Sequence, residues 1–408
     1  MNSKPYSCKL ALSITASILA ACGASALEAP LTWINTNMPP IDIHGFASQG
    51  FIINSGNENY LGGNSSQGTF DFREYGVNAS MAYDKWRIGA QFYGQKLGPY
   101  GDDEVKLDWG TIDYQATQWF GLRAGRVKMP RGLYNETLDL DSTRAFVLLP
   151  QSVYDARLRD FQASFDGGMA YGNIEMGKAG SLDYKVFGGH IPMSTSSGAS
   201  DYFNVDAPFP NLAIHMDDAF GGSLFWNTPV QGLRIGYSAS DYQNLYTLRN
   251  VFGTDLYKNC PNYVRQLVSV EYTRGDWVFA AEGGYDDAKY TVGSPATGDM
   301  NVFLYQNNFY YYASATYRVN HWLQLGSYFS YTHWQQRNVN AVVSTPNLNQ
   351  ADTALSARFD LTDYLIFKIE AHYMQGAGEV FSMPSDPQPL SGRTDSWAMF
   401  DAKVTLSF

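Results

Sequence analysis

The chain has 408 residues and a net charge of −11, yet only 16% of its residues are charged and 15% are aromatic. The acidic balance argues against nucleic acid as a partner, because phosphate binding needs a basic surface. Few charges together with 38 Gly, 29 Tyr and 24 Phe favour a sheet that faces lipid on one side and water on the other.

The first 26 residues predict an export signal. Lys4 and Lys9 precede an apolar stretch at 10–21 that is too short to span a bilayer, and a small-residue cleavage site follows at 24–26. Cleavage after residue 26 predicts a mature, exported chain.

A second processing route stays open, because residues 19–22 also fit a lipid-attachment motif that ends in Cys22. Cleavage after residue 26 instead leaves Cys260 as the remaining cysteine, so no internal disulfide is expected. A short Pro-containing lead at 27–40 then precedes the first predicted strand.

From residue 41 onward the chain alternates in polarity with a period of two, which is typical of strands with two different faces. In residues 365–373, for example, Leu365, Phe367 and Ile369 alternate with Lys368 and Glu370. No later apolar stretch is long enough for a spanning helix. Sixteen strands are predicted, near 42–53, 70–83, 86–96, 105–117, 119–127, 160–177, 182–191, 216–227, 230–241, 263–273, 277–288, 306–319, 322–335, 350–361, 364–375 and 394–407.

The connections between these strands alternate between short and long. This rhythm and the even strand count predict an all-β fold: a transmembrane antiparallel β-barrel with short periplasmic turns and long extracellular loops, occupying 41–408. Segment 160–177 is the ambiguous one, and we interpret its Asp166-Gly167-Gly168 as a β-bulge within a single strand. Aromatic residues next to the short turns predict an interfacial girdle; they are Tyr83, Trp86, Trp119, Trp226, Trp277, Trp322 and Tyr364.

The last predicted strand alternates Phe400, Ala402, Val404 and Leu406 with polar residues and ends in Phe408. An amphipathic C-terminal strand that ends in Phe resembles the assembly signal of outer-membrane barrel proteins.

Three further segments, 125–134, 154–160 and 171–174, are similar to proteobacterial porins, including the phosphate-selective and dicarboxylate types. The resemblance implies a sixteen-stranded, usually trimeric channel in the outer membrane of a Gram-negative bacterium, with one loop folded into the lumen.

The longest connection, at about 128–159, is the predicted constriction loop, because loops of this length are usually functional or disordered. It holds an apolar run at 145–150 that would be costly in open water. The alternative, a surface loop in contact with lipid sugars, stays open. The predicted constriction and selectivity residues are Arg131, Glu136, Asp139, Asp141, Arg144, Asp155, Arg157 and Arg159.

Charged strand residues predict the wall of the lumen, because a charge facing lipid near the midplane costs about 2–4 kcal/mol. Arg123 and Arg126 lie on opposite faces by parity, so one of them is expected near a rim or a bulge. The predicted lumen-wall residues are Arg87, Arg234, Arg265, Glu282, Arg358, Lys368 and Glu370.

These features predict a non-enzymatic porin for passive diffusion of small hydrophilic solutes, with a slight preference for anionic or dipolar ones. Its expected partners are outer-membrane lipid, lipopolysaccharide, small polar solutes and two further copies of the chain. No cofactor or metal is expected, because the six His lack metal-ligand spacing and no nucleotide-binding motif occurs.

Two alternatives from other classes remain. The first is a non-conducting adhesin or envelope anchor that uses loops 192–215, 242–262 and 376–393 for its contacts. The second is a barrel enzyme that uses His333 or His372.

Overall fold

A computed structural model describes residues 39–57, 60–62, 67–203, 209–338, 349–380 and 393–408. The predicted export signal and its alternative lipidation site lie outside the described residues. The chain divides into two units, 1–40 and 41–408, and the second unit holds the strands. Within the described ranges, no helix combines the length and the apolar character needed to cross a membrane.

The second unit is built from one antiparallel sheet. Its strands are β1 (Ile41–Asn54), β2 (Phe72–Tyr83), β3 (Trp86–Leu97), β4 (Lys106–Thr117), β5 (Phe120–Lys128), β6 (Ser164–Glu175), β7 (Ser181–His190), β8 (Asn211–His215), β9 (Ala219–Asn227), β10 (Leu233–Val251), β11 (Thr254–Arg274), β12 (Trp277–Ser294), β13 (Gly298–Arg318), β14 (Leu323–Asn338), β15 (Asn349–Asp360), β16 (Leu365–Gly376) and β17 (Ser396–Ser407). Short helices lie in the connections: η1 (Tyr60–Gly62), η2 (Asn135–Thr137), η3 (Asp141–Thr143), η4 (Ala156–Leu158), α2 (Arg159–Gln162), η5 (Gly177–Ala179) and α3 (Gly198–Tyr202).

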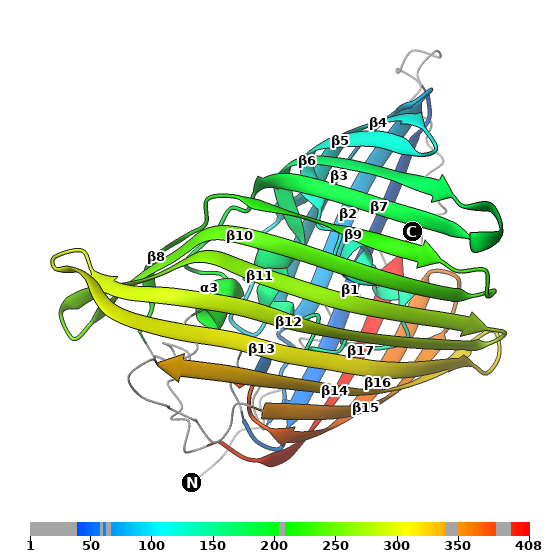
Figure 1. Ribbon diagram of the computed structural model, residues 1–408. Helices are drawn as coiled ribbons and strands as arrows, with labels where there is room; N and C mark the ends of the chain where they lie inside the picture. The colour runs from blue at the N-terminus through cyan, green and yellow to red at the C-terminus, as the bar shows by residue number, and fades with distance from the viewer. Residues whose placement is uncertain (1–38, 58–59, 63–66, 204–208, 339–348, 381–392) are drawn as a thin grey trace, which may run out of the picture. The chain divides into compact units, whose positions relative to one another are not determined.

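The sheet closes on itself because β1 pairs with both β2 and β17. Sixteen strands form the closed ring, and β8 adds only to the far end of β10. Figure 1 shows the strands running side by side around the unit. The predicted all-β, sixteen-stranded antiparallel barrel is therefore confirmed.

The two faces of each strand differ as the alternation predicts. On β16 the side chains of Ile366, Lys368 and Glu370 are buried, whereas Ala371 and Tyr373 are exposed. The outward face of the barrel carries large exposed apolar side chains, as a lipid-facing surface does. The seven aromatic residues predicted to form a girdle are all among these exposed side chains.

Segment 160–177 is a single strand preceded by a helical turn, and the predicted bulge within it is wrong. Residues 164–175 pair with β5 and β7 without a register shift. Gly167 and Gly168 face glycine or alanine on both neighbours, so small side chains let the ladder continue. The register shift near the loop lies in β4 instead, where Gln91 faces Trp109 and Phe92 faces Leu107.

The prediction of a long loop at 242–262 is also wrong. The residues extend β10 and β11 into a long hairpin that turns at Phe252 and Gly253, both with positive φ. In this segment polar side chains lie on both faces of the strands, because a strand outside the bilayer can be solvated on both sides. The alternation that identifies a strand is therefore missing from the sequence. Loop 192–215 contains α3 and β8, and most of loop 376–393 lies outside the described residues.

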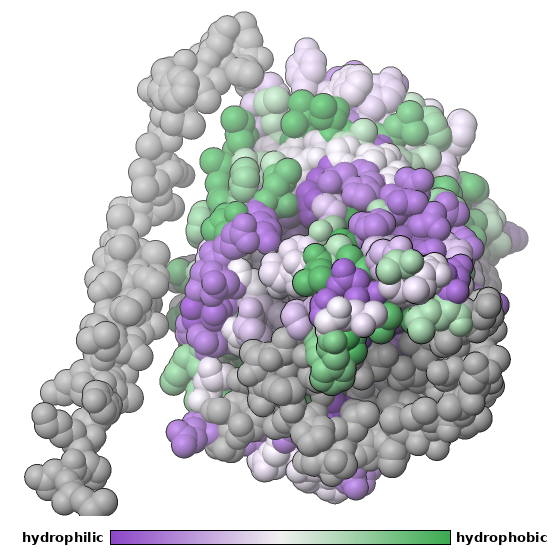
Figure 2. All heavy atoms as spheres, turned by 90° about the vertical axis from the view of Figure 1, so that its left-hand side faces the viewer, coloured by the Kyte–Doolittle hydropathy of each residue, from purple (hydrophilic) through white to green (hydrophobic). Residues whose placement is uncertain are grey.

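Figure 2 looks at the end of the barrel that carries the long connections, where hydrophilic residues gather in the middle of the visible face.

Candidate functional site

The connection between β5 and β6 lies inside the barrel. Its backbone N–H groups donate to inward-facing side chains of distant strands. Gly132 donates to Ser238 of β10 at 2.9 Å, and Leu133 donates to Glu282 of β12 at 2.9 Å. Val147 donates to Glu370 of β16 at 2.9 Å. The constriction loop is therefore bonded along the wall made by β10 to β17.

The apolar run of the loop packs on this same wall. All six residues at 145–150 are buried. The Phe146 ring lies edge-on to Tyr328, with 5.1 Å between centroids, and Val147 packs with Trp397 in one apolar cluster. The alternative of a surface loop is thereby set aside, because a loop in contact with lipid sugars would not bury these side chains against inward-facing residues.

Asp141 is the ionic anchor of the loop. Its carboxylate lies 3.1 Å from Lys368 Nζ and 3.2 Å from Lys403 Nζ, and it accepts a 2.7 Å hydrogen bond from Thr405. Burial alone would raise the pKa of Asp141, but Lys368, Lys403 and Arg144 outweigh it and hold that pKa well below its usual range. Asp141 therefore stays charged and ties η3 to β16 and β17.

Several predicted selectivity residues form hydrogen bonds or ion pairs that hold the loop in place. Arg131 is buried and donates to Val153 O and Tyr310, while Arg157 pairs with Asp155 at 2.5 Å. Arg144 donates to Leu138 O at 2.7 Å. These four residues and Asp141 do not line the main cavity described below, whereas Asp141 does line the second space beside it. Their contacts position the loop, and their part in selectivity stays a prediction.

The opposite side of the loop faces an open cavity of about 270 Å³. Strands β2 to β5 form one wall, and the loop forms the other. A second space of about 360 Å³ shares Asn78 and Leu140 with it and extends toward β1 and β17. The main cavity is lined by Asn78, Arg87, Gly89, Gln91, Trp109, Thr111, Asp113, Arg123, Lys128, Glu136, Asp139 and Leu140.

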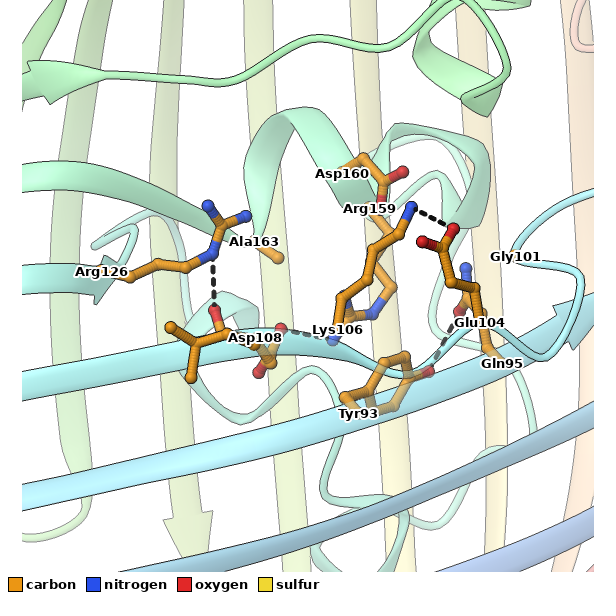
Figure 3. A pocket seen from close by; sticks show the side chains of 11 residues that line it. Tyr93, Gln95, Gly101, Glu104, Lys106, Asp108, Arg126, Arg159, Asp160 and Ala163 are labelled. Carbon is orange, nitrogen blue, oxygen red and sulfur yellow. Dashed lines mark hydrogen bonds and ion pairs between the residues drawn. The ribbon is translucent and has the colours of Figure 1, made fainter.

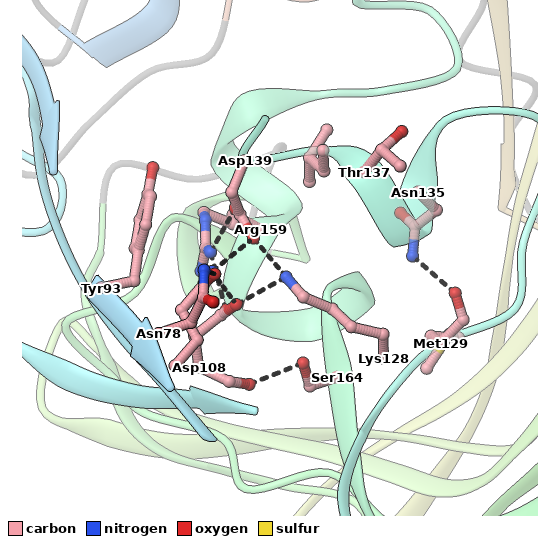
Figure 4. A network of polar contacts seen from close by, with 12 residues as sticks. Asn78, Tyr93, Asp108, Lys128, Met129, Asn135, Thr137, Asp139, Arg159 and Ser164 are labelled. Atoms are coloured by element: carbon pink, nitrogen blue, oxygen red, sulfur yellow. Dashed lines mark hydrogen bonds and ion pairs between the residues drawn. The ribbon is translucent and has the colours of Figure 1, made fainter. Parts of the chain in front are cut away.

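A four-residue ionic bridge spans the gap between loop and wall (Figure 4). Asp108 of β4 lies 2.6 Å from Lys128 Nζ and 2.7 Å from Arg159, and Asp139 of the loop pairs with the same two cations. Gln91 donates to Asp108 at 3.0 Å. Burial alone would raise the pKa of Asp139, but Arg159 and Lys128 hold it well below its usual range. We call Asp108, Lys128, Asp139 and Arg159 the ionic bridge.

The ionic bridge separates two spaces. Lys128 and Asp139 line the main cavity, whereas Asp108 and Arg159 line a smaller one of about 50 Å³. Figure 3 shows this smaller cavity, with Arg126 bonded to Asp108 and Arg159 close to Tyr93. The Arg159 guanidinium stacks 3.6 Å from the Tyr93 ring centre. The bridge therefore lies between the two spaces.

Charges of opposite sign face each other across the main cavity. Arg87 and Arg123 project from the barrel wall, and Glu136 and Asp139 project from the loop. Arg123 pairs with Asp113 at 2.6 Å, whereas the exposed Arg87 reaches only Ser80 at 3.4 Å among its described hydrogen bonds. Arg126 lines the smaller cavity and pairs with Asp166, and Gly125 between the two arginines has a positive φ that breaks the alternation of β5. The cavity thus carries charges of both signs, with Asp113 beside Arg123 on the wall and Lys128 beside Asp139.

All seven predicted lumen-wall residues lie on the inward face of their strands. Of these seven, only Arg87 lines the main cavity. Arg234 is half-exposed and lies 3.6 Å from Asp183. The loop or α2 covers the rest: Arg265 pairs with Asp286, Glu282 binds the loop, Arg358 donates to Arg144 O, and Lys368 and Glu370 are fully buried.

Sequence reasoning missed the wall side of the constriction. Asp108, Gln91 and Trp109 come from β3 and β4 at the register shift. A weak signal exists, because Asp108 and Asp113 in one strand cannot both face inward under strict alternation. Periodicity alone cannot tell which of two strand residues a bulge turns inward.

Comparison with solved structures shows the fold. OmpT of Vibrio cholerae matches with a TM-score of 0.54 at 11% identity, covering 92% of this chain and 99% of that one. The outer membrane channel DcaP of Acinetobacter baumannii matches at 0.55 and 9%, covering 92% and 99%. An anion-selective porin from Comamonas acidovorans matches at 0.52 and 10%, covering 90% and 99%. The predicted resemblance to porins is confirmed at the level of fold.

Neither the family models nor the curated proteins give a match to the sequence.

Proposed function

We propose that this protein is a bacterial outer-membrane porin that passes small hydrophilic solutes by diffusion. The observation that carries the proposal is the charged cavity of about 270 Å³ between the constriction loop and the wall of β2 to β5. Nine of its twelve lining residues are charged or polar, which suits hydrated solutes rather than lipid. The alternation of exposed apolar and inward polar residues supports placement in a bilayer.

The proposed preference is for dipolar solutes. Arg87 and Arg123 on the wall oppose Glu136 and Asp139 on the loop, so a solute that carries both signs of charge can align with the field. The predicted preference for anions loses part of its support, because Arg131, Arg144 and Arg157 are engaged beneath the loop.

The proposal includes export, lipid contact and assembly. An export signal at 1–26 and an apolar outer face suit insertion into the outer membrane of a Gram-negative cell, in contact with lipid and lipopolysaccharide. A homotrimer is proposed by analogy with the fold, since one solved neighbour, OmpT of Vibrio cholerae, is described in a trimer form. Cross-linking of the purified barrel in detergent tests the assembly, and a single-chain band would reject the trimer.

We propose that the barrel transports solutes and does not use His333 or His372, the two candidate enzyme residues, for catalysis. His372 is buried among carboxylates beneath the loop, where a substrate in the cavity cannot reach it. His333 interacts with Asn349 at the far end of β14.

Liposome swelling with sugars of graded size tests the proposed channel. Swelling that falls with sugar size is the expected result, because the ionic bridge limits passage. Absence of swelling with the smallest sugar, from barrels whose folding is verified by their heat-modifiable electrophoretic mobility, would reject diffusion and favour the binding alternative.

A further inference from the structure

A buried group of acids and one histidine lies beneath the constriction loop. Glu370 and His372 project inward from β16, and Asp401 projects inward from the adjacent β17. Their side chains are at most 1% exposed. One potential ligand atom from each of the three lies within 4.8 Å of the others. We call these three residues the Glu-His-Asp cluster.

The register of the two strands places like charges opposite each other. Glu370 and Asp401 are direct partners in the β16–β17 ladder. Carboxylates directly opposite on one face repel, and burial makes uncompensated charge costly. A cation at this point of the sheet would relieve both costs.

The nearest lysines are already engaged with other acids. Lys368 and Lys403 both pair with Asp141, and Lys403 also pairs with Glu74. These ion pairs join the two lysines to the loop through Asp141 and to β2 through Glu74, and none of them reaches the Glu-His-Asp cluster.

Four polar atoms of the cluster lack a hydrogen bond. They are Glu370 Oε1, His372 Nε2 and both carboxylate oxygens of Asp401. His372 Nε2 lies 3.1 Å from Glu370 Oε1 and 3.4 Å from Asp401 Oδ2 and forms a hydrogen bond with neither. Buried polar atoms normally find a partner, so these four point to a ligand between them.

Neighbouring residues hold the side chains of His372 and Glu370 in orientations typical of metal ligands. His372 Nδ1 lies 3.1 and 3.2 Å from the two oxygens of Asp352, which also accepts a 2.9 Å bond from Tyr328. A histidine ligand typically donates its second ring N–H to a carboxylate in this way, which frees the other nitrogen for a metal. Glu370 Oε2 is held by the Val147 N–H, leaving Oε1 free.

We propose that Glu370, His372 and Asp401 bind a divalent transition-metal ion of the Zn²⁺ class. One imidazole nitrogen and two carboxylate oxygens form a ligand set that Zn²⁺ accepts, with a water in the fourth position. Tetrahedral Zn²⁺ with bonds of 2.0–2.1 Å separates its ligands by about 3.3 Å, which the two measured separations of 3.1 and 3.4 Å bracket. The bound ion joins β16 to β17 next to the anchored loop.

The proposed site escapes a sequence search because its ligands lie on two strands. Glu370 and His372 are two residues apart on one face, and Asp401 is supplied by the next strand. The site is also closed by the loop above it, so the ion is expected to enter while the barrel folds.

Metal content of the folded, full-length barrel tests the site. The protein is refolded with Zn²⁺, passed over a desalting column and analysed by mass spectrometry of the metal. One Zn²⁺ per chain is expected, with loss to background in Asp401→Asn and His372→Gln. His321→Gln, at an exposed short turn, is the matched control and should retain the ion.

A second readout separates metal loss from misfolding. Refolding with Co²⁺ should give the visible absorption of a tetrahedral centre in the unmodified protein, and Zn²⁺ should raise the Tm of that protein but not of Asp401→Asn. Electrophoretic mobility verifies that each variant folds. Zn²⁺ absent from the folded unmodified barrel, retained in both cluster variants, or replaced in competition by Mg²⁺ or Ca²⁺ would overturn the proposal.

Discussion

The inner wall of this barrel has two regions that use the same residue types for opposite purposes. Beneath the loop, Lys368 and Glu282 are 0% and 2% exposed and each is bonded to the constriction loop. On the open side, Arg87 and Arg123 line a water-accessible cavity. An inward-facing charge is therefore not by itself a selectivity residue.

What covers a charge decides its role. Beneath the loop the dielectric is low, so each ion pair must be complete and its loss is felt as instability. On the open side water screens the charges, so their loss changes the field that a solute meets and hardly changes stability. Variants in the two regions should separate into stability effects and permeability effects.

The largest effect is expected beneath the loop, from Asp141→Asn. The substitution removes a buried carboxylate from Lys368 and Lys403 and leaves Lys368 without its ion-pair partner. Breaking a buried pair on one side costs about 3–5 kcal/mol, so the free energy of unfolding in detergent should fall by about that amount in a urea titration. Asp166→Asn, at an exposed pair with Arg126, is the control. Equal losses in both variants would abolish the distinction between the regions.

A smaller effect is expected from the pH response of Glu379, in the connection after β16. Burial and then the nearby Asp155 raise the pKa of Glu379 from 4.5 to about 8. The folded barrel therefore keeps a proton that the unfolded chain releases, so its stability is highest below about pH 4.5 and falls as the pH rises toward 8. The loss should be about 2 kcal/mol, below the upper bound of about 5 kcal/mol set by the shift.

In Glu379→Gln the new side-chain amide oxygen can still accept a hydrogen bond from Gln350. The substitution removes the titratable carboxyl group. Thermal unfolding of both proteins at pH 5 and pH 9 measures the difference. The unmodified barrel should lose more stability than the variant between these values, and parallel curves would contradict the burial of a protonated carboxyl here.

On the open side, Arg87→Glu should change ion selectivity without unfolding the barrel. Each unit charge about 7 Å from an ion in water changes its energy by about 0.6 kcal/mol, so the reversal from Arg to Glu changes it by about 1.2 kcal/mol, which is roughly eightfold in local concentration. The reversal potential under a salt gradient should therefore move toward cation selectivity, and Glu136→Gln should move it the other way. Shifts of the same sign in both variants would contradict a field across the cavity.

The smallest effect is expected at the pair between Lys185 and Glu136, whose side chains are 30% and 35% exposed. Half-exposed pairs contribute about 0–1 kcal/mol, so Lys185→Ala should change the unfolding free energy by less than about 1 kcal/mol. A larger loss in the same urea titration would show that this part of the loop is anchored as firmly as Asp141.

The strands were predictable from the sequence because the bilayer imposes a strict rule on them. A lipid-facing residue must be apolar and its neighbour need not be, so alternation predicts Lys368 and Glu370 on the inner face correctly. The same rule ends where the bilayer ends. Residues 242–262 were therefore predicted as a loop although they form a paired hairpin.

The candidate site was only half predictable. Length and the apolar run at 145–150 predict that the loop folds inward, since such a run needs cover. The burial of Arg131 and Arg157 depends on partners such as Tyr310 that lie far away in sequence, and spacing carries no information on those contacts. Asp108 becomes visible once the register of β3 and β4 is known.

The proposed solute path runs between the loop and the wall of β2 to β5, and cysteine accessibility tests it most directly. Arg87→Cys places a thiol on the cavity, and Ser356→Cys places one beneath the loop, where Ser356 donates to Ala145 O; native Cys260 is buried. A bulky cationic thiol reagent should reduce the single-channel current of Arg87→Cys and leave that of Ser356→Cys unchanged. Reduction in the Ser356→Cys channel alone would place the passage on the other side of the loop and contradict the account.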